Sequence, residues 1–161
     1  MNEGRLAKRT PVREIEDSLD IDPVVVHDTD DLLTVARSAF LKPQTRVLAV
    51  VDDGGRLVGV LPVVRIVEEI VAQAAPEQLI AEISDLAGVE RFGREVAARI
   101  ASDLASPPVA LHPDDTVGDA FRLMHEHRYT GLPVVDGEGR VTGYVDLLEL
   151  CLLYTSDAAD E

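Results

Sequence analysis

The sequence has few aromatic residues and almost no cysteine. Its 161 residues include no Trp, three Tyr, three Phe and one Cys. One cysteine excludes both a disulfide framework and a zinc site built from several cysteines. The hydrophobic core must therefore be made mainly from Val, Leu, Ile and Ala.

Basic residues are also scarce. There are 15 Lys and Arg against 30 Asp and Glu, which gives a formal net charge of −15. This balance excludes proteins that neutralise nucleic-acid phosphates over a broad surface, and it disfavours binding to anionic membranes. No apolar run approaches the ~20 residues that span a bilayer, and the N-terminus lacks the apolar core of a signal peptide. We therefore expect a cytoplasmic protein with no nucleic-acid partner and no membrane insertion.

The last eleven residues, Cys151 to Glu161, form a distinct tail. Their sequence, CLLYTSDAADE, resembles the translation of a sequencing-library transposon adapter. We therefore predict that residues 151–161 are not native and leave them out of the fold argument. Without the tail the chain has no cysteine, and its formal net charge changes from −15 to −12.

The remaining sequence contains an internal repeat. The segment PVVVH at 23–27 returns as PVALH at 108–112, and VVDDGGRLVG at 50–59 returns as VVDGEGRVTG at 134–143. The offsets of 85 and 84 residues indicate a single insertion or deletion between the copies, most simply within 41–44. Such self-similarity indicates two related structural units.

Each copy is predicted to read strand, helix, strand, strand, helix. In the second copy, a short apolar strand at 109–111 is followed by a T-x-x-D capping box at Thr116 and Asp119. Apolar residues at 117, 120, 121 and 124 then form one stripe of a helix. Runs at 132–135 and 141–145 flank a Gly-containing turn and predict a hairpin, while Pro62 is expected in the first turn of the last helix of copy one.

Between the copies lies a segment of helical character. A helix is predicted to start at Pro76 and Glu77 and end at Gly88, and its apolar stripe comprises Leu79, Ile80, Ile83 and Leu86. A second stripe comprises Val96, Ile100 and Leu104. We divide the chain into a leader at 1–22, repeats at 23–71 and 106–150, a helical connector at 72–105, and the tail.

These motifs resemble a tandem CBS domain pair, also called a Bateman module. The resemblance covers residues 20–71 and 104–150, and HPDDTVGDAFRLM at 112–124, TGLPVVD at 130–136 and GRVTGYVDLLE at 139–149 carry it. It implies an α+β (α/β) fold in which two β-α-β-β-α repeats pack by pseudo-twofold symmetry. It also implies homodimers and two clefts that hold adenosine-type ligands such as AMP or ATP. The implied role is non-enzymatic: the module would transmit ligand occupancy to an effector that the sequence does not identify.

The resemblance points to candidate ligand-binding residues. The segment Thr130-Gly131-Leu132-Pro133 would provide an apolar slot and backbone polar groups, since Gly131 would let a ligand approach the backbone. The family motif G-h-x-[ST]-x-x-D corresponds to GYVDLLE at 143–149, so Asp146 replaces a phosphate-binding hydroxyl and Glu149 replaces a ribose-binding Asp. In copy one the corresponding residues are Pro62 and Arg65. The full candidate set is Pro108, Val109, Thr130, Gly131, Leu132, Pro133, Asp146, Glu149 and Arg65.

Catalytic and metal-binding motifs are weak. His125 and His127 are two positions apart and so lie on different helix faces, while His27 and His112 occupy matching repeat positions. The sequence has no H-E-x-x-H, G-x-S-x-G or P-loop motif, so we expect no enzyme, no catalytic residues and no bound cofactor.

Two alternatives stay open. One is a ligand-free structural module whose connector helices serve dimerisation. The other is a divalent-cation sensor, in which Mg²⁺ would screen the Asp residues at 28, 30, 31, 52, 53, 114 and 115. The competing interpretation of these aspartates is helix capping and turn formation.

Overall fold

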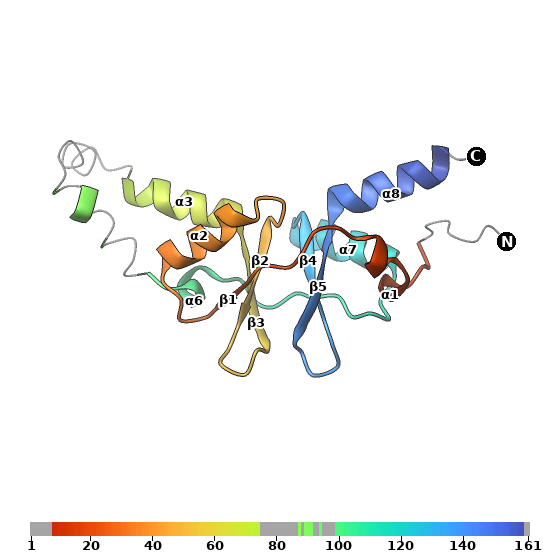
Figure 1. Ribbon diagram of the computed structural model, residues 1–161, viewed down its shortest axis with the longest axis horizontal. Coiled ribbons are helices and arrows are strands. Elements are labelled where there is room, and N and C mark those ends of the chain that lie inside the picture. Colours follow the sequence, from red (N-terminus) through yellow and green to blue (C-terminus); the bar gives the residue numbers. More distant parts are fainter. Residues whose placement is uncertain (1–7, 75–86, 88, 92–93, 95–98, 160–161) are drawn as a thin grey trace.

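A computed structural model describes residues 8–74, 87, 89–91, 94 and 99–159. The chain forms two similar halves, each with its strands at the centre of the molecule and its helices on the outside (Figure 1). This mixed arrangement confirms the predicted α+β class. The predicted connector residues Pro76, Glu77, Leu79, Ile80, Ile83, Leu86, Gly88 and Val96 lie outside the described residues.

The first half contains a three-stranded sheet. Strand β1 (Val25–His27) pairs in parallel with β2 (Val47–Val51), which pairs antiparallel with β3 (Leu57–Pro62). Helix α2 (Leu32–Leu41) joins β1 to β2, and α3 (Val63–Ala74) follows β3. Pro62 ends β3 opposite Val47, so the prediction that it lies in the first helical turn is wrong by one position.

The second half contains helix α7 (Val117–His127), the β4–β5 hairpin (Gly131–Val135 and Val141–Asp146) and helix α8 (Leu147–Ala159). The strand expected at 109–111 is reduced to one parallel bridge between Leu111 and Val134. There the Leu111 N–H donates to the Pro133 carbonyl, and the Leu111 carbonyl accepts from the Val135 N–H. Proline lacks an N–H, so Pro107, Pro108 and Pro113 leave little backbone on either side that can extend the pairing.

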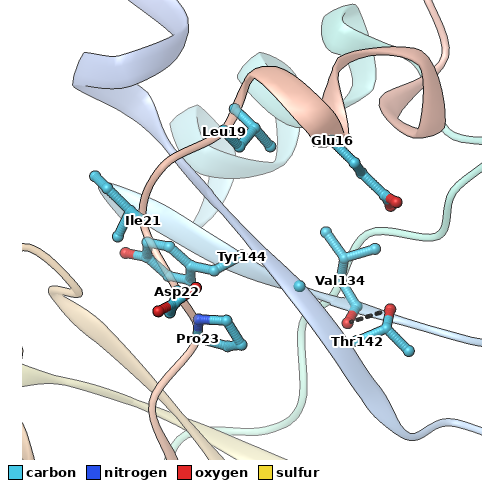
Figure 2. A pocket seen from close by; sticks show the side chains of 9 residues that line it. Glu16, Leu19, Ile21, Asp22, Pro23, Val134, Thr142 and Tyr144 are labelled. Atoms are coloured by element: carbon cyan, nitrogen blue, oxygen red, sulfur yellow. Dashed lines mark hydrogen bonds between the residues drawn. The ribbon is translucent and has the colours of Figure 1, made fainter.

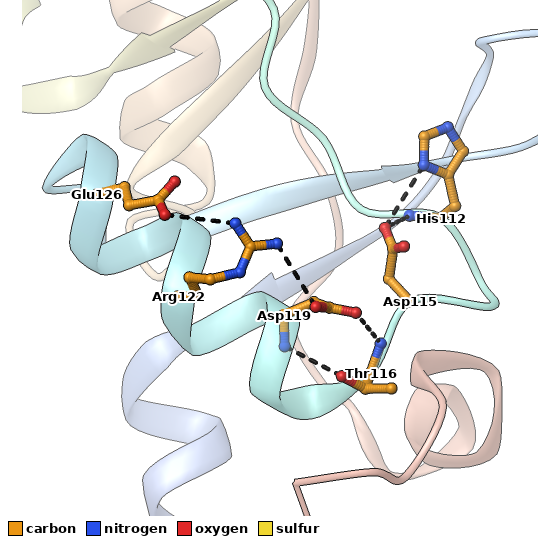
Figure 3. Close-up of polar contacts among 6 residues, drawn as sticks. All are labelled: His112, Asp115, Thr116, Asp119, Arg122 and Glu126. Atoms are coloured by element: carbon orange, nitrogen blue, oxygen red, sulfur yellow. Dashed lines mark hydrogen bonds and ion pairs between the residues drawn. The ribbon is translucent and has the colours of Figure 1, made fainter.

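The local signals of the repeat are confirmed in both halves. The Thr116 hydroxyl accepts from the Asp119 N–H at 3.1 Å, and Asp119 accepts from the Thr116 N–H at 3.0 Å, as the capping box requires. Figure 3 shows this pair beside a second one, in which the Asp115 carboxylate accepts from the His112 N–H. Asp30 accepts from the His27 N–H in the same way, so the two histidines share a structural position.

Each half has its own core, and the segments that precede the repeats cross over to complete them. In the leader, Val12 and Ile15 of helix α1 (Val12–Ile15) are buried in the core of repeat two. A 3₁₀ turn, η1 (Glu16–Ser18), follows before the chain runs back to β1. Ala101 and Leu104 of helix α6 (Ala101–Leu104) are buried in the core of repeat one. A small third cluster, centred on Val47, Val60 and Tyr144, joins the halves.

None of the helices in the described part of the chain is long and apolar enough to cross a membrane. Residues 151–159 of the predicted non-native tail continue α8, which does not test their origin.

Candidate functional site

A cavity of about 580 Å³ lies between the leader, the start of β2 and the start of α8. This volume is within the usual range for small-molecule sites, ~300–1,000 Å³. Its lining combines both repeats and the leader: Ser18, Asp20, Ile21, Gln44, Arg46, Asp146, Leu148, Glu149, Leu152 and Leu153. A molecule bound here would touch both halves of the fold.

Asp146 lies at the inner end of this cavity, where β5 meets α8. It is only 3 % exposed, yet both of its carboxylate oxygens have partners. Oδ1 accepts from Arg46 Nη2 at 2.8 Å, and Oδ2 accepts from the backbone N–H groups of Leu148 and Glu149 at 3.0 and 3.2 Å. The carboxylate therefore caps α8 and neutralises Arg46 at the same time.

Tyr144 contacts the backbone of Arg46. Its side chain is 2 % exposed, and its hydroxyl accepts from the Arg46 N–H at 3.3 Å. Burial, together with the nearby Asp146 charge, raises the pKa of Tyr144 to about 12, so the phenol stays neutral. The ring lies directly against Gly131, where any Cβ would overlap the phenol.

Glu149 lies one helical turn further along α8. Its Oε1 accepts from the Asp20 N–H at 2.9 Å, which ties the leader to the helix. Burial is the main cause of the raised pKa of Glu149, and the charges of Asp20 and Asp146 add to it. Glu149 therefore brings a carboxylate, which can accept hydrogen bonds, to the cavity lining.

The outer part of the cavity is apolar. Leu148 is 59 % exposed and Leu152 is 70 % exposed, and both face the cavity together with Ile21 and Leu153. Such a wall suits a flat aromatic ring. Leu152 and Leu153 belong to the tail that the sequence predicts to be non-native, so the native wall up to residue 150 consists of Ile21 and Leu148.

A family model described as "CBS domain" matches the chain twice, at residues 12–72 and 101–154. The chain belongs to the CBS-domain family. This membership confirms the predicted tandem pair.

Individual proteins similar to this CBS pair support the same conclusion. An uncharacterized protein of Methanocaldococcus jannaschii is 29 % identical over 143 residues, which cover 79 % of this chain and 84 % of that protein. The crystal structure of a CBS domain-containing protein from Thermotoga maritima has a TM-score of 0.69 at 25 % identity, covering 91 % of this chain and 94 % of that one.

Two further solved structures contain ligands. The CBS domain pair of protein MJ0100, in complex with 5′-methylthioadenosine and S-adenosyl-L-methionine, has a TM-score of 0.63 at 22 % identity and covers 91 % of this chain and 97 % of that one. The CBS-pair protein CBSX2 of Arabidopsis thaliana, in complex with AMP, has a TM-score of 0.62 at 20 % identity and covers 94 % of this chain and 99 % of that one. At these identities the likeness establishes the shared fold.

The structure separates the residues that the sequence grouped as one candidate set. Asp146 and Glu149 line the cavity, whereas Thr130–Pro133 do not. Leu132 is buried in the core of repeat two, and the Thr130 carbonyl accepts from the Leu147 N–H. The space expected beside Gly131 for a ligand is filled by the Tyr144 ring. Pro108 is exposed, and Val109 packs against the same core as Leu132.

Arg65 lies elsewhere, on α3 of repeat one, where its Nη1 is 3.5 Å from the Ser106 hydroxyl. Sequence reasoning missed Arg46, which corresponds to Thr130 at the offset of 84 residues. The pseudo-twofold symmetry could have predicted it. In such a pair, the residue before the central strand of one repeat lies opposite the start of the last helix of the other repeat.

A second, smaller hollow of about 150 Å³ lies between the leader and the β4–β5 hairpin. Figure 2 shows Leu19, Ile21 and Pro23 of the leader beside Tyr144 and Val134. Val134 belongs to the core of repeat two and Ile21 packs against the third cluster, so this hollow lies where the leader packs on the β4–β5 hairpin.

Several of the aspartates considered for cation sensing have partners within the chain. Asp31 accepts from the Thr34 N–H, Asp52 from the N–H groups of Gly54 and Arg56, and Asp114 pairs with Arg13. In the ranges that the structure describes, no group of three His, Cys, Asp or Glu side chains is arranged to hold a metal ion. These contacts support the capping and turn interpretation.

Proposed function

We propose that this CBS pair is a non-enzymatic regulatory module that binds an adenosine-type ligand in the 580 Å³ cavity. The observation that carries the proposal is the combination of a ribose acceptor, Glu149, with an apolar wall that includes Ile21 and Leu148. Adenine would lie against the apolar side chains, while the ribose hydroxyls would donate to the Glu149 carboxylate. The ligands named for two similar CBS-pair structures support this class.

The mechanism follows from the composition of the lining. Asp20 and Ile21 come from the leader, Gln44 and Arg46 from repeat one, and Glu149 from repeat two. A ligand that contacts all three would favour one relative position of the repeats and bias an attached or partner effector by ~1–3 kcal/mol of coupling. A cytoplasmic location is part of this proposal.

The direct test is calorimetric titration of the whole chain with adenosine. Binding is expected for the natural sequence, and Glu149→Ala should weaken it at least tenfold because the ribose loses its acceptor. Glu138→Ala is the matched control, since Glu138 is an exposed carboxylate in the β4–β5 turn. Absence of heat with adenosine, its phosphates and its charged analogues would contradict the proposal.

One observation favours a second candidate, a dimerisation module. Helix α3 exposes Val64, Val67 and Val71, and α8 exposes Leu148 and Leu152, which places apolar side chains on the last helix of each repeat. Exposed apolar surfaces of this kind are typical of protein–protein contacts. Size-exclusion chromatography with light scattering would show a dimer that Val67→Glu weakens, with Val58→Glu on β3 as the control. A monomer at all concentrations would contradict this candidate.

A further inference from the structure

The cavity holds one basic side chain, and that side chain is already neutralised. Among the described residues that line the cavity, Arg46 is the only Lys, Arg or His, and the acidic residues are Asp20, Asp146 and Glu149. Its guanidinium donates to the buried Asp146 at 2.8 Å. With this pair counted as neutral, the lining keeps two carboxylates and a formal charge of −2.

Asp146 holds the position where a ligand anion would have to bind. An anion entering the inner end would need Arg46 and the two N–H groups at the start of α8. The Asp146 carboxylate already accepts from all three of these donors. A phosphate would therefore have to displace a carboxylate that the chain itself supplies, and it would be repelled if that carboxylate stayed in place.

We propose that the Arg46–Asp146 pair makes this site select adenosine derivatives that carry a positive charge and reject phosphorylated ones. This inference rests on the proposed function and concerns which members of the adenosine class the site accepts. A cationic group attached at the ribose 5′ position would enter the same inner end, where Asp146 already neutralises Arg46, and the net charge of −2 on the lining would attract it.

The test compares three ligands that share adenine and ribose and carry a positive, a neutral or a negative group at the 5′ position. These are 5′-amino-5′-deoxyadenosine, adenosine and AMP, titrated into the whole chain at pH 6.5 and low ionic strength. For the natural sequence, affinity should fall in that order by at least fivefold at each step. Added salt should narrow the differences, since they are electrostatic.

Two substitutions should change the ratio of amine affinity to AMP affinity in opposite directions. Asp146→Asn keeps a side-chain oxygen that can cap α8 but frees Arg46, so AMP should gain at least tenfold relative to the amine. Arg46→Gln removes the only cation of the lining, so the ratio of amine to AMP affinity should increase. Asp53→Asn, in the exposed β2–β3 turn, raises the net charge by one as Asp146→Asn does, and it should leave all ratios unchanged.

The outcomes separate this inference from the function beneath it. If the natural sequence prefers AMP to the amine, or if Arg46→Gln leaves the ratio unchanged, charge selection is wrong while adenosine binding stands. If none of the three ligands binds, the proposed function is wrong and the selection fails with it. If Asp146→Asn does not fold, two measurements still test charge selection. They are the order of the three affinities for the natural sequence and the ratio of amine to AMP affinity for Arg46→Gln.

Discussion

The two repeats have the same order of elements but place very different side chains at equivalent positions. Where repeat two has Asp146 and Glu149 at the start of its last helix, repeat one has Pro62 and Arg65. Where repeat one has Arg46 before its central strand, repeat two has Thr130. The symmetry of the fold therefore does not extend to the chemistry of its clefts.

The difference shows which residues of each repeat form the site. The cavity takes Arg46 from repeat one and Asp146 from repeat two, and these two side chains form an ion pair across the pseudo-twofold. The opposite side has Arg65 close to Ser106 instead. One fold thus produces one acidic, carboxylate-rich site and one position with a basic residue.

The largest effect is expected at Gly131, whose equivalent in repeat one is Val47. In Gly131→Ala, the new Cβ would overlap the Tyr144 phenol, and overpacking of this kind should lower the free energy of unfolding by about 3 kcal/mol. Urea denaturation would measure it. Gly137→Ala is the control, because nothing lies within 4 Å of a Cβ at that position. A change at Gly131 no larger than the control would mean that the Tyr144 ring is placed differently.

The next effect is expected at Asp146. Asp146→Ala leaves Arg46 without its carboxylate and removes the cap of α8, so it should cost about 2 kcal/mol. Pro62→Ala, at the equivalent position of repeat one, removes no acceptor and should cost less than half as much. Thermal and urea unfolding of the two variants would test this asymmetry, and equal losses would contradict it.

The helix caps give a smaller effect with a clear pH signature. Thr116 caps α7 and Asp31 caps α2 at the equivalent position. Thr116→Ala removes the hydroxyl that accepts from the Asp119 N–H, so it should cost about 1 kcal/mol at neutral pH. The Thr116 N–H and, after it, the Thr116 hydroxyl lower the pKa of Asp119, so part of this cost should be lost in acid.

The Asp31 cap should depend on pH. The Thr34 N–H lowers the pKa of Asp31, so the stabilisation is present above the ordinary value of 3.8 and is lost as the pH falls through the lowered value. The deficit of Asp31→Ala in urea denaturation should therefore shrink as the pH falls through the lowered value. A deficit that stays constant into acid would count against this assignment.

The contribution of Glu149 to stability should change with pH in the opposite direction to that of Asp31. Burial raises its pKa above the ordinary 4.5, so the folded protein is most favoured while this carboxyl is protonated and loses stability as the pH rises through the raised value. Glu149→Gln should therefore raise the melting temperature, and by more at pH 7 than at pH 4. Glu138→Gln should show no such trend. A variant that is less stable than the natural sequence at pH 7 would mean that the charge of Glu149 is needed for its bond to Asp20.

The smallest effect is expected from divalent cations. Because Asp30, Asp31 and Asp52 already accept backbone N–H groups, millimolar Mg²⁺ should shift the melting temperature no more than NaCl of matched ionic strength. A specific shift that Asp52→Asn abolishes, but Asp136→Asn in repeat two does not, would restore the cation-sensing alternative for repeat one.

Much of the fold could be predicted because its signals are local. The capping box at Thr116, the turn at Asp136 and the apolar stripe of α7 are set by residues within a few positions of one another. The strand at 109–111 was predicted too long because the prolines around it limit the pairing to Leu111, which depends on the strand that it meets.

The site could be predicted only in part. Asp146 and Glu149 follow a motif of known spacing and do line the cavity. Arg46 belongs to no motif, and its role depends on a contact across 100 residues of sequence. Gly131 was expected to make room for a ligand, but the ring of Tyr144, which lies diagonally across the hairpin, fills that room.

The two repeats, their helices and hairpins, and the acidic character of the chain therefore follow from the amino-acid sequence alone, because helix and strand propensity, capping and hydrophobic period are local properties. The tertiary structure decided which repeat faces which, and hence that Arg46 meets Asp146 while the leader closes over Glu149. The physical reason is that these contacts join residues far apart in the sequence. They exist only because the two repeats and the leader pack against one another.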